Sequence, residues 1–145
     1  MLGFEKVQIR AMRHDDEPHL FLLAEECCAP GQLAADETVG ALSACDVFVA
    51  EHDGEVAGYV ALVNERTDVV IRQLLVATGH TERKVGDQLC DWAEGYAVSR
   101  GFDRLRVDAS GQDQTARTFY TRRGYVPVKD GCLELRLPSL ANAID

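Results

Sequence analysis

The sequence predicts an α/β (α+β) domain with a mixed, mostly antiparallel central sheet flanked by helices. Apolar segments at 47–50, 56–63 and 69–77 are joined by short polar turns, so we expect three consecutive antiparallel strands. An apolar stripe at helical spacing follows the third strand, and an alternating strand follows the stripe. Strand, helix and strand form a βαβ unit, in which parallel pairing is the default. The whole chain reads β-α-α-β-β-β-α-β-α-β-β.

The N-terminal third predicts one strand and two helices. Val7, Ile9 and Ala11 alternate with polar residues, as in a strand with one buried face. Acids and a proline at 15–18 are typical of a helix start, and Pro30-Gly31 ends that helix. Its buried stripe is expected to comprise Leu20, Leu23, Ala24 and Cys27. A shorter helix is predicted at 36–44.

Two features of the central hairpin region stand out. Asp53-Gly54 predicts a tight turn, because both positions tolerate a positive φ. Gly58 lies within the strand that follows, and a glycine there is compatible with a local opening between this strand and the next. A second short turn at 64–68 leads into the strand at 69–77.

The C-terminal half predicts two helices and three strands. The first helix ends at Arg100-Gly101, a basic last turn with a glycine stop, after a stripe of Val85, Leu89, Trp92, Ala93 and Tyr96. Leu105, Val107 and Ala109 alternate as a strand. A helix over 113–123 places Ala116, Phe119 and Tyr120 on one face, and Gly124 ends it. Strands at 125–128 and 133–137, with a turn at Asp130-Gly131, form the last hairpin.

Composition limits the class of protein. The 145 residues are 46% hydrophobic, which fits a single domain over 1–145. No apolar run is long enough to span a bilayer, and no signal segment is evident, so we expect a cytoplasmic protein. Five scattered cysteines and four histidines show no metal-ligand spacing, which predicts reduced thiols and no metal. The net charge of −9 argues against nucleic-acid and membrane partners and is compatible with a cationic amine substrate.

The segment from 69 to 89 suggests an anion site. A buried strand leads through a tight loop to a helix N-terminus, where free backbone N–H groups can bind a phosphate. Arg83 and Lys84 lie in the first helical turn, although the helix dipole favours acids there. The alternative interpretation is two solvated basic residues, with Glu82 balancing the dipole.

Four segments together resemble the GCN5-related N-acetyltransferase (GNAT) superfamily over essentially the whole chain. IRAMRHDDEPHLFLLAEE resembles its first strand and helix, and DVFVAEHDGEVAGYVALV its central hairpin. QLLVATGHTERKVGDQLCDWAEGYAVSRGFDRLRVD resembles its cofactor-binding motif, and DQTARTFYTRRGYVPV its second motif. The resemblance implies a GNAT-like fold and the transfer of an acetyl group from acetyl-CoA to a primary amine of a small molecule or peptide.

The resemblance also implies a set of cofactor-binding residues. The family's pyrophosphate loop, Gln/Arg-x-x-Gly-x-Gly/Ala, corresponds to Thr81, Glu82, Arg83, Lys84, Val85 and Gly86, with Asp87 following. Only Gly86 is kept, and Lys84 replaces the glycine that lets the backbone approach a pyrophosphate. Main-chain N–H groups at Leu75 and Val76 are the expected oxyanion and positioning donors. Asp113 stands where the family usually has Asn.

Tyr120 matches the family's tyrosine that faces the CoA sulfur. A phenol is protonated at neutral pH and can donate its proton to a departing thiolate. The alternative is a core tyrosine on an apolar helix face. Asp68, His80 and Asp108 are candidate general bases, and none is assigned, since a water relay needs no dedicated base.

Two functions follow from these observations. The first is an acetyl-CoA-dependent N-acetyltransferase that acts on an amine substrate and needs no metal. Such an enzyme could be a homodimer. The alternative is a non-catalytic GNAT-fold domain that acts as an acyl-CoA sensor or a protein-interaction module, because its pyrophosphate loop departs from the family pattern.

Overall fold

The computed structural model describes residues 7–27, 41–77, 82–108 and 114–138. Packing divides the chain into two compact units. Unit 1 comprises residues 1–61 and 73–92, and unit 2 comprises residues 62–72 and 93–145. Strands β3 and β4 and helix α3 contribute residues to both units, so each unit is described by itself below.

Unit 1 contains β1 (Val7–Ala11), α1 (Glu17–Cys27), β2 (Asp46–His52) and most of β3 (Glu55–Asn64). β1 pairs antiparallel with β2, with Ile9 opposite Ala50. Asp53 and Gly54 both have positive φ, as the sequence predicts for the turn between β2 and β3. The core of this unit brings together apolar side chains of the helix, a short 3-10 turn (Ala41–Ala44) and both strands: Leu20, Leu23, Leu42, Val47, Val49, Tyr59 and Ala61.

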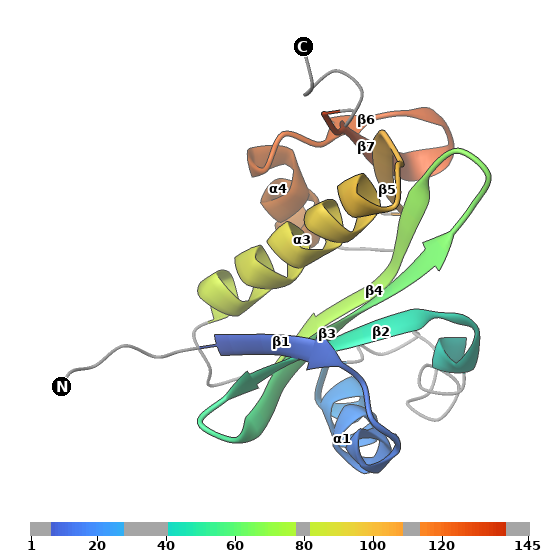
Figure 1. Ribbon diagram of the computed structural model, residues 1–145. Helices are drawn as coiled ribbons and strands as arrows, with labels where there is room; N and C mark the ends of the chain where they lie inside the picture. Colours follow the sequence, from blue (N-terminus) through green and yellow to red (C-terminus); the bar gives the residue numbers. More distant parts are fainter. Residues whose placement is uncertain (1–6, 28–40, 78–81, 109–113, 139–145) are drawn as a thin grey trace, which may run out of the picture. The chain divides into compact units, whose positions relative to one another are not determined.

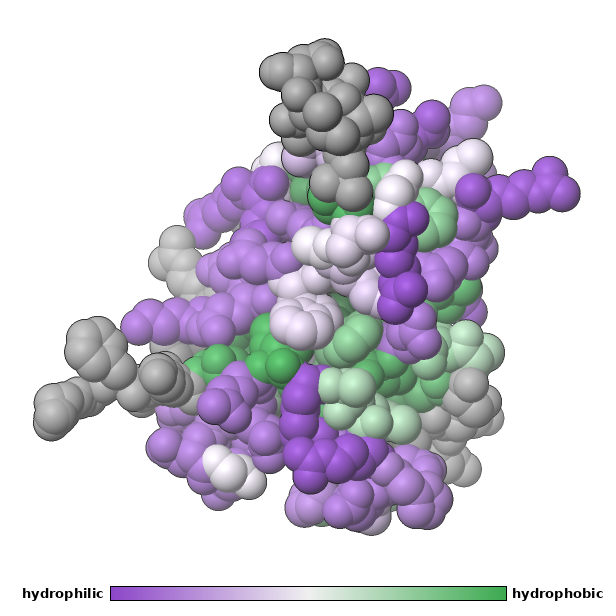
Figure 2. Space-filling model, in the orientation of Figure 1, coloured by the Kyte–Doolittle hydropathy of each residue, from purple (hydrophilic) through white to green (hydrophobic). Residues whose placement is uncertain are grey.

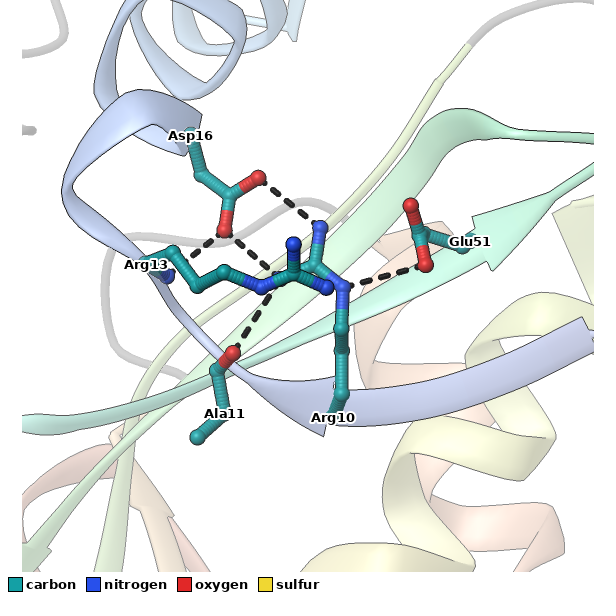
Figure 3. A network of polar contacts seen from close by, with 5 residues as sticks. All are labelled: Arg10, Ala11, Arg13, Asp16 and Glu51. Atoms are coloured by element: carbon teal, nitrogen blue, oxygen red, sulfur yellow. Dashed lines mark hydrogen bonds and ion pairs between the residues drawn. The ribbon is translucent and has the colours of Figure 1, made fainter.

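An ion network joins three elements of unit 1 (Figure 3). The Arg10 guanidinium of β1 donates to both carboxylate oxygens of Asp16, at 2.7 and 2.9 Å, and to Glu51 of β2 at 3.0 Å. Asp16, in the 3-10 turn His14–Asp16 that precedes α1, also accepts the backbone N–H of Arg13 at 2.7 Å. These hydrogen bonds from Arg10 lower the pKa of the Asp16 carboxyl from 3.8 to about 2. The network therefore connects the start of α1 to the edge of the sheet.

Unit 2 is built on β5 (Arg104–Asp108), which pairs with strands on both sides. Val69, Val70 and Ile71 of β4 (Val69–Val76) pair parallel with Leu105, Arg106 and Val107. On the other side, β7 (Cys132–Arg136) pairs antiparallel with β5 and with the short β6 (Val126–Pro127). The predicted βαβ unit is therefore confirmed, with α3 (Glu82–Ser99) as its helix.

The described strands form one seven-stranded sheet in the order β1-β2-β3-β4-β5-β7-β6 (Figure 1). The predicted mixed, mostly antiparallel sheet is confirmed. β7 lies between β5 and β6, so the last strand of the chain is not the edge strand. No helix in the described ranges is long and apolar enough to cross a membrane, and Figure 2 shows a mostly hydrophilic described surface on the face drawn.

Both C-terminal helices end in the same way. At the end of α4 (Gln114–Arg122), Gly124 has a φ of 101° and donates to the Thr121 carbonyl, while Tyr125 donates to the Tyr120 carbonyl. This pair of bonds defines a Schellman motif, and it needs a left-handed residue that glycine supplies without strain. Gly101 and Phe102 repeat the arrangement after α3. Both predicted glycine stops are confirmed.

Three sequence predictions need correction. Tyr125 is not a strand residue, because its N–H caps α4 and its ring is buried. Trp92, predicted on the buried stripe of α3, is 39% exposed, although its ring packs against Phe48 at 5.3 Å. In the helix predicted at 36–44, residues 41–44 form a 3-10 turn, and residues 36–40 lie outside the described ranges.

Gly95 offers a stabilising substitution. It is exposed within α3, and a Cβ added there would meet no atom within 4 Å. Gly95→Ala should therefore raise the free energy of unfolding by about 0.5–1 kcal/mol, because alanine loses less backbone entropy in a helix. Urea denaturation followed by circular dichroism measures the change, and a lower stability of the variant would contradict the described packing.

Candidate active site

The pairing of β3 with β4 contains one extra residue in β4. At the turn, the Glu65 N–H donates to the Asp68 carbonyl, and at the far end the Ala77 N–H donates to the Ala57 carbonyl. Between these two hydrogen bonds, β3 advances by eight residues, from Ala57 to Glu65, whereas β4 advances by nine, from Asp68 to Ala77. In a regular antiparallel ladder both strands contain the same number of residues between two such hydrogen bonds. The extra residue therefore shows that β4 carries a β-bulge.

The bulge lies opposite Gly58. An ideal Cβ on Gly58 would stand 2.6 Å from the Leu75 carbonyl oxygen and 3.3 Å from the Val76 Cα. Two residues of β4 therefore face one residue of β3, which is the defining geometry of a bulge. The structure brings together the predicted donors Leu75 and Val76 at this irregular point of the sheet.

A partly buried hydrogen bond lies beside the bulge. Tyr59 is fully buried, and its hydroxyl donates to the Gln73 Oε1 at 2.6 Å. From Gln73 to Val76 every residue is half-buried, in contrast to the buried run Val69–Ile71. The second half of β4 is thus less buried than the first three residues of the strand.

Of the predicted pyrophosphate loop, Thr81 to Gly86, all residues but Thr81 lie within the first turns of α3, which begins at Glu82. Arg83 and Lys84 therefore lie in the first helical turn, as predicted. Lys84 is exposed, Val85 and Gly86 are buried, and Asp87 is half-buried. Thr81 and Asp113 lie outside the described residues. An exposed ammonium group beside the N–H groups of an 18-residue helix suits an anionic ligand.

Tyr120 lies in unit 2, near the C-terminal end of α4. It is only 3% exposed, and its ring makes edge contacts with Phe119 at 5.2 Å and with Tyr125 at 5.3 Å. Its carbonyl accepts the N–H groups of Arg123 and Tyr125 at 3.0 and 3.1 Å. The backbone and the ring of Tyr120 are therefore both held by the residues that cap the helix.

Glu94 supports this cap from α3. One of its carboxylate oxygens accepts the Arg123 guanidinium at 3.0 Å and the Tyr125 hydroxyl at 3.3 Å. Sequence reasoning missed Glu94, because nothing in the spacing of α3 distinguishes it from other solvated acids. The same holds for Gln73, which sits among apolar residues in a strand and gave no signal of its partner.

The candidate bases divide between described and undescribed positions. Asp68 forms an ion pair with the Arg106 Nε at 3.1 Å, at the opposite end of β4 from Val76. Asp108 ends β5, and His80 lies outside the described residues.

Several solved structures that share this fold are described as acetyltransferases. The PaiA N-acetyltransferase from Thermoplasma acidophilum, solved in complex with coenzyme A, matches with a TM-score of 0.75 at 18% identity, over 90% of this chain and 99% of that one. The ribosomal-protein-S18-alanine N-acetyltransferase from Escherichia coli matches with a TM-score of 0.73 at 15% identity, over 92% and 94% of the two chains. At these identities the likeness concerns the fold.

The sequence itself identifies the family. The Acetyltransferase (GNAT) family model matches residues 7–125, well over half of the chain. This protein therefore belongs to the GNAT acetyltransferase family. A curated relative, "Probable N-acetyltransferase camello" of Xenopus tropicalis, is 28% identical over 98 residues, which cover 66% of this chain and 43% of that protein. The match thus spans less than half of the relative's length.

Proposed function

We propose that this protein transfers an acetyl group from acetyl-CoA to a primary amine of a small molecule or peptide. Membership of the GNAT family supports the transferase class. The observation that carries the proposal is the bulge at Leu75–Val76, since it makes the ladder irregular at the position expected to supply main-chain donors.

In the proposed reaction the amine nitrogen attacks the thioester carbonyl. The carbonyl π electrons move onto oxygen, and main-chain N–H groups at Leu75 and Val76 stabilise this oxyanion. When the intermediate collapses, the C–S bond breaks and the CoA thiolate takes a proton from the Tyr120 hydroxyl. The attacking amine loses a proton to water, so no dedicated base is required, and a proton from solvent restores the Tyr120 hydroxyl.

The first turn of α3 is the proposed phosphate-binding element. Lys84 is exposed and supplies a positive charge near the helix N-terminus, where backbone N–H groups also favour an anion. Gly86 is the glycine kept from the family's loop pattern. These residues suit the diphosphate of CoA. The charge of Lys84 would take over the role of the glycine that, in the family pattern, lets the backbone approach the diphosphate closely.

Ligand-induced stabilisation tests the proposal directly. At about 100 times its Kd, acetyl-CoA should raise the free energy of unfolding by about 2.7 kcal/mol, which raises the Tm by roughly 5–10 °C for a chain of this size. Release of free CoA thiol over a panel of amines then tests catalysis. Binding without turnover would point to the sensor function. The absence of binding would refute both the transferase and the sensor and would favour the protein-interaction module.

Removal of the Lys84 charge should weaken CoA binding. For an exposed ion pair we expect Lys84→Ala to raise the Kd about 3–5-fold at low salt, and the difference should shrink as salt screens the charges. Lys129→Ala removes the same charge from an exposed turn and is the matched control. If the two variants raise the Kd equally, Lys84 does not belong to the phosphate-binding site.

A further inference from the structure

We infer that Gly58 is a positioning residue that sets the orientation of the Leu75–Val76 peptide, and through it the direction of the Val76 N–H. The inference rests on the proposed function, in which this peptide serves the oxyanion. Gly58 itself would contact neither substrate.

Space, and not backbone torsion, requires glycine at position 58. Its φ does not lie in the left-handed region, so other residues could adopt its backbone conformation. An ideal Cβ would nevertheless lie 2.6 Å from the Leu75 carbonyl oxygen, closer than real Cβ contacts come. A backbone oxygen cannot rotate away as a flexible side chain can, so a Cβ would force the peptide to move.

The position of this oxygen also fixes the opposite end of the same peptide. In a regular strand the Cβ points out of the sheet and the carbonyl points along it toward the neighbouring strand. A carbonyl oxygen close to the Cβ position of Gly58 has therefore turned toward the face of the sheet. Because the peptide is trans, the Val76 N–H points away from Gly58.

The packing of α3 limits how the peptide can adjust. The Leu89 side chain is fully buried, and its Cδ1 stands 3.3 Å from the same Cβ position. The Leu75 carbonyl and the Leu89 methyl group thus share the space that a side chain at position 58 would fill. An added methyl group would push the carbonyl, and the peptide would rotate with it.

The substitution Gly58→Ala tests the inference. We expect kcat to fall about 100-fold, the size of effect seen when a donor is misplaced or lost at an oxyanion. The Kd for CoA, measured by calorimetry, should change less than about threefold, because the phosphate-binding turn is untouched. This split between kcat and binding distinguishes a change in peptide orientation from general loss of structure.

Two further variants make the experiment decisive. Gly95→Ala adds the same methyl group to open space in α3 and should keep wild-type kcat. Gly58→Ala combined with Leu89→Val removes the crowding methyl group but leaves the carbonyl contact, so folding should improve while kcat stays low. Each kcat is calculated from the concentration of protein that binds CoA, so that partial unfolding of a variant does not lower its apparent kcat.

The outcomes separate the two proposals. An active wild type with normal kcat in Gly58→Ala would overturn the role of Gly58 and leave the proposed function in place. Recovery of kcat in the double variant would assign the effect to Leu89 packing, against the inference. If neither Gly58→Ala nor the double variant folds, the inference is also overturned, because Gly58 would then be required for folding and not for the orientation of the peptide. A wild type without turnover refutes the proposed function itself.

Discussion

Tyr120→Phe should lower kcat on the order of 100-fold while leaving CoA binding nearly unchanged. The substitution removes only the hydroxyl that is proposed to protonate the departing thiolate, and general acids typically contribute 10²-fold or more. We expect an effect near the lower end of the usual contribution of a general acid, because a thiol with a pKa of about 8.5 is already a good leaving group. Initial rates of thiol release at saturating acetyl-CoA measure this change.

Tyr125→Phe is the matched control for Tyr120. Both tyrosines are buried, their rings touch, and both belong to the cap of α4. Loss of the Tyr125 hydroxyl breaks its hydrogen bond to Glu94 and should cost about 1 kcal/mol of stability with little change in kcat. If the two variants lose activity equally, Tyr120 acts as a core residue, which is the alternative that the sequence left open.

Arg10→Ala should destabilise the protein by about 2–4 kcal/mol at neutral pH. The substitution leaves the Asp16 carboxylate, only 8% exposed, without the guanidinium that accounts for two of its hydrogen bonds. An uncompensated carboxylate of this kind costs far more than a broken surface pair. Arg104→Ala, which opens a long 3.8 Å pair between two exposed groups, is the control and should cost about 1 kcal/mol or less.

The pH dependence provides an independent check on Arg10. Asp16 has a folded pKa of about 2 against an ordinary value of 3.8. A lowered folded pKa stabilises the native state above pH 3.8, and this contribution is lost as the pH falls toward 2. It amounts to about 2 kcal/mol. Glu51, whose pKa Arg10 also lowers, changes stability in the same direction.

Urea denaturation between pH 7 and pH 2.5 measures this effect. Wild type should lose stability steeply in acid, whereas Arg10→Ala has already lost the interaction and should lose less. The difference between the two proteins should therefore narrow as the pH falls. A constant difference across this range would show that Arg10 stabilises the protein through packing and not through its charge.

Local signals in the sequence determined the elements and the family. Period-2 and helical spacings located β1 to β5, α1, α3 and α4 to within a few residues, because each element buries one face. The glycine stops at 101 and 124 and the turns at 53–54 and 130–131 were also predicted correctly, since positive φ values favour these residue types. The motif segments sufficed to indicate the GNAT family, which the family match confirms.

Only the tertiary structure decided the features that depend on partners distant in sequence. The sequence shows only that position 58 is a glycine, whereas the bulge exists through its pairing with Leu75 and Val76. The insertion of β7 between β5 and β6 likewise depends on which strand edges meet, and the sequences of all three are compatible with other orders. Residue spacing records which face of an element is buried, whereas register and strand order arise from contacts between elements, which no local pattern contains.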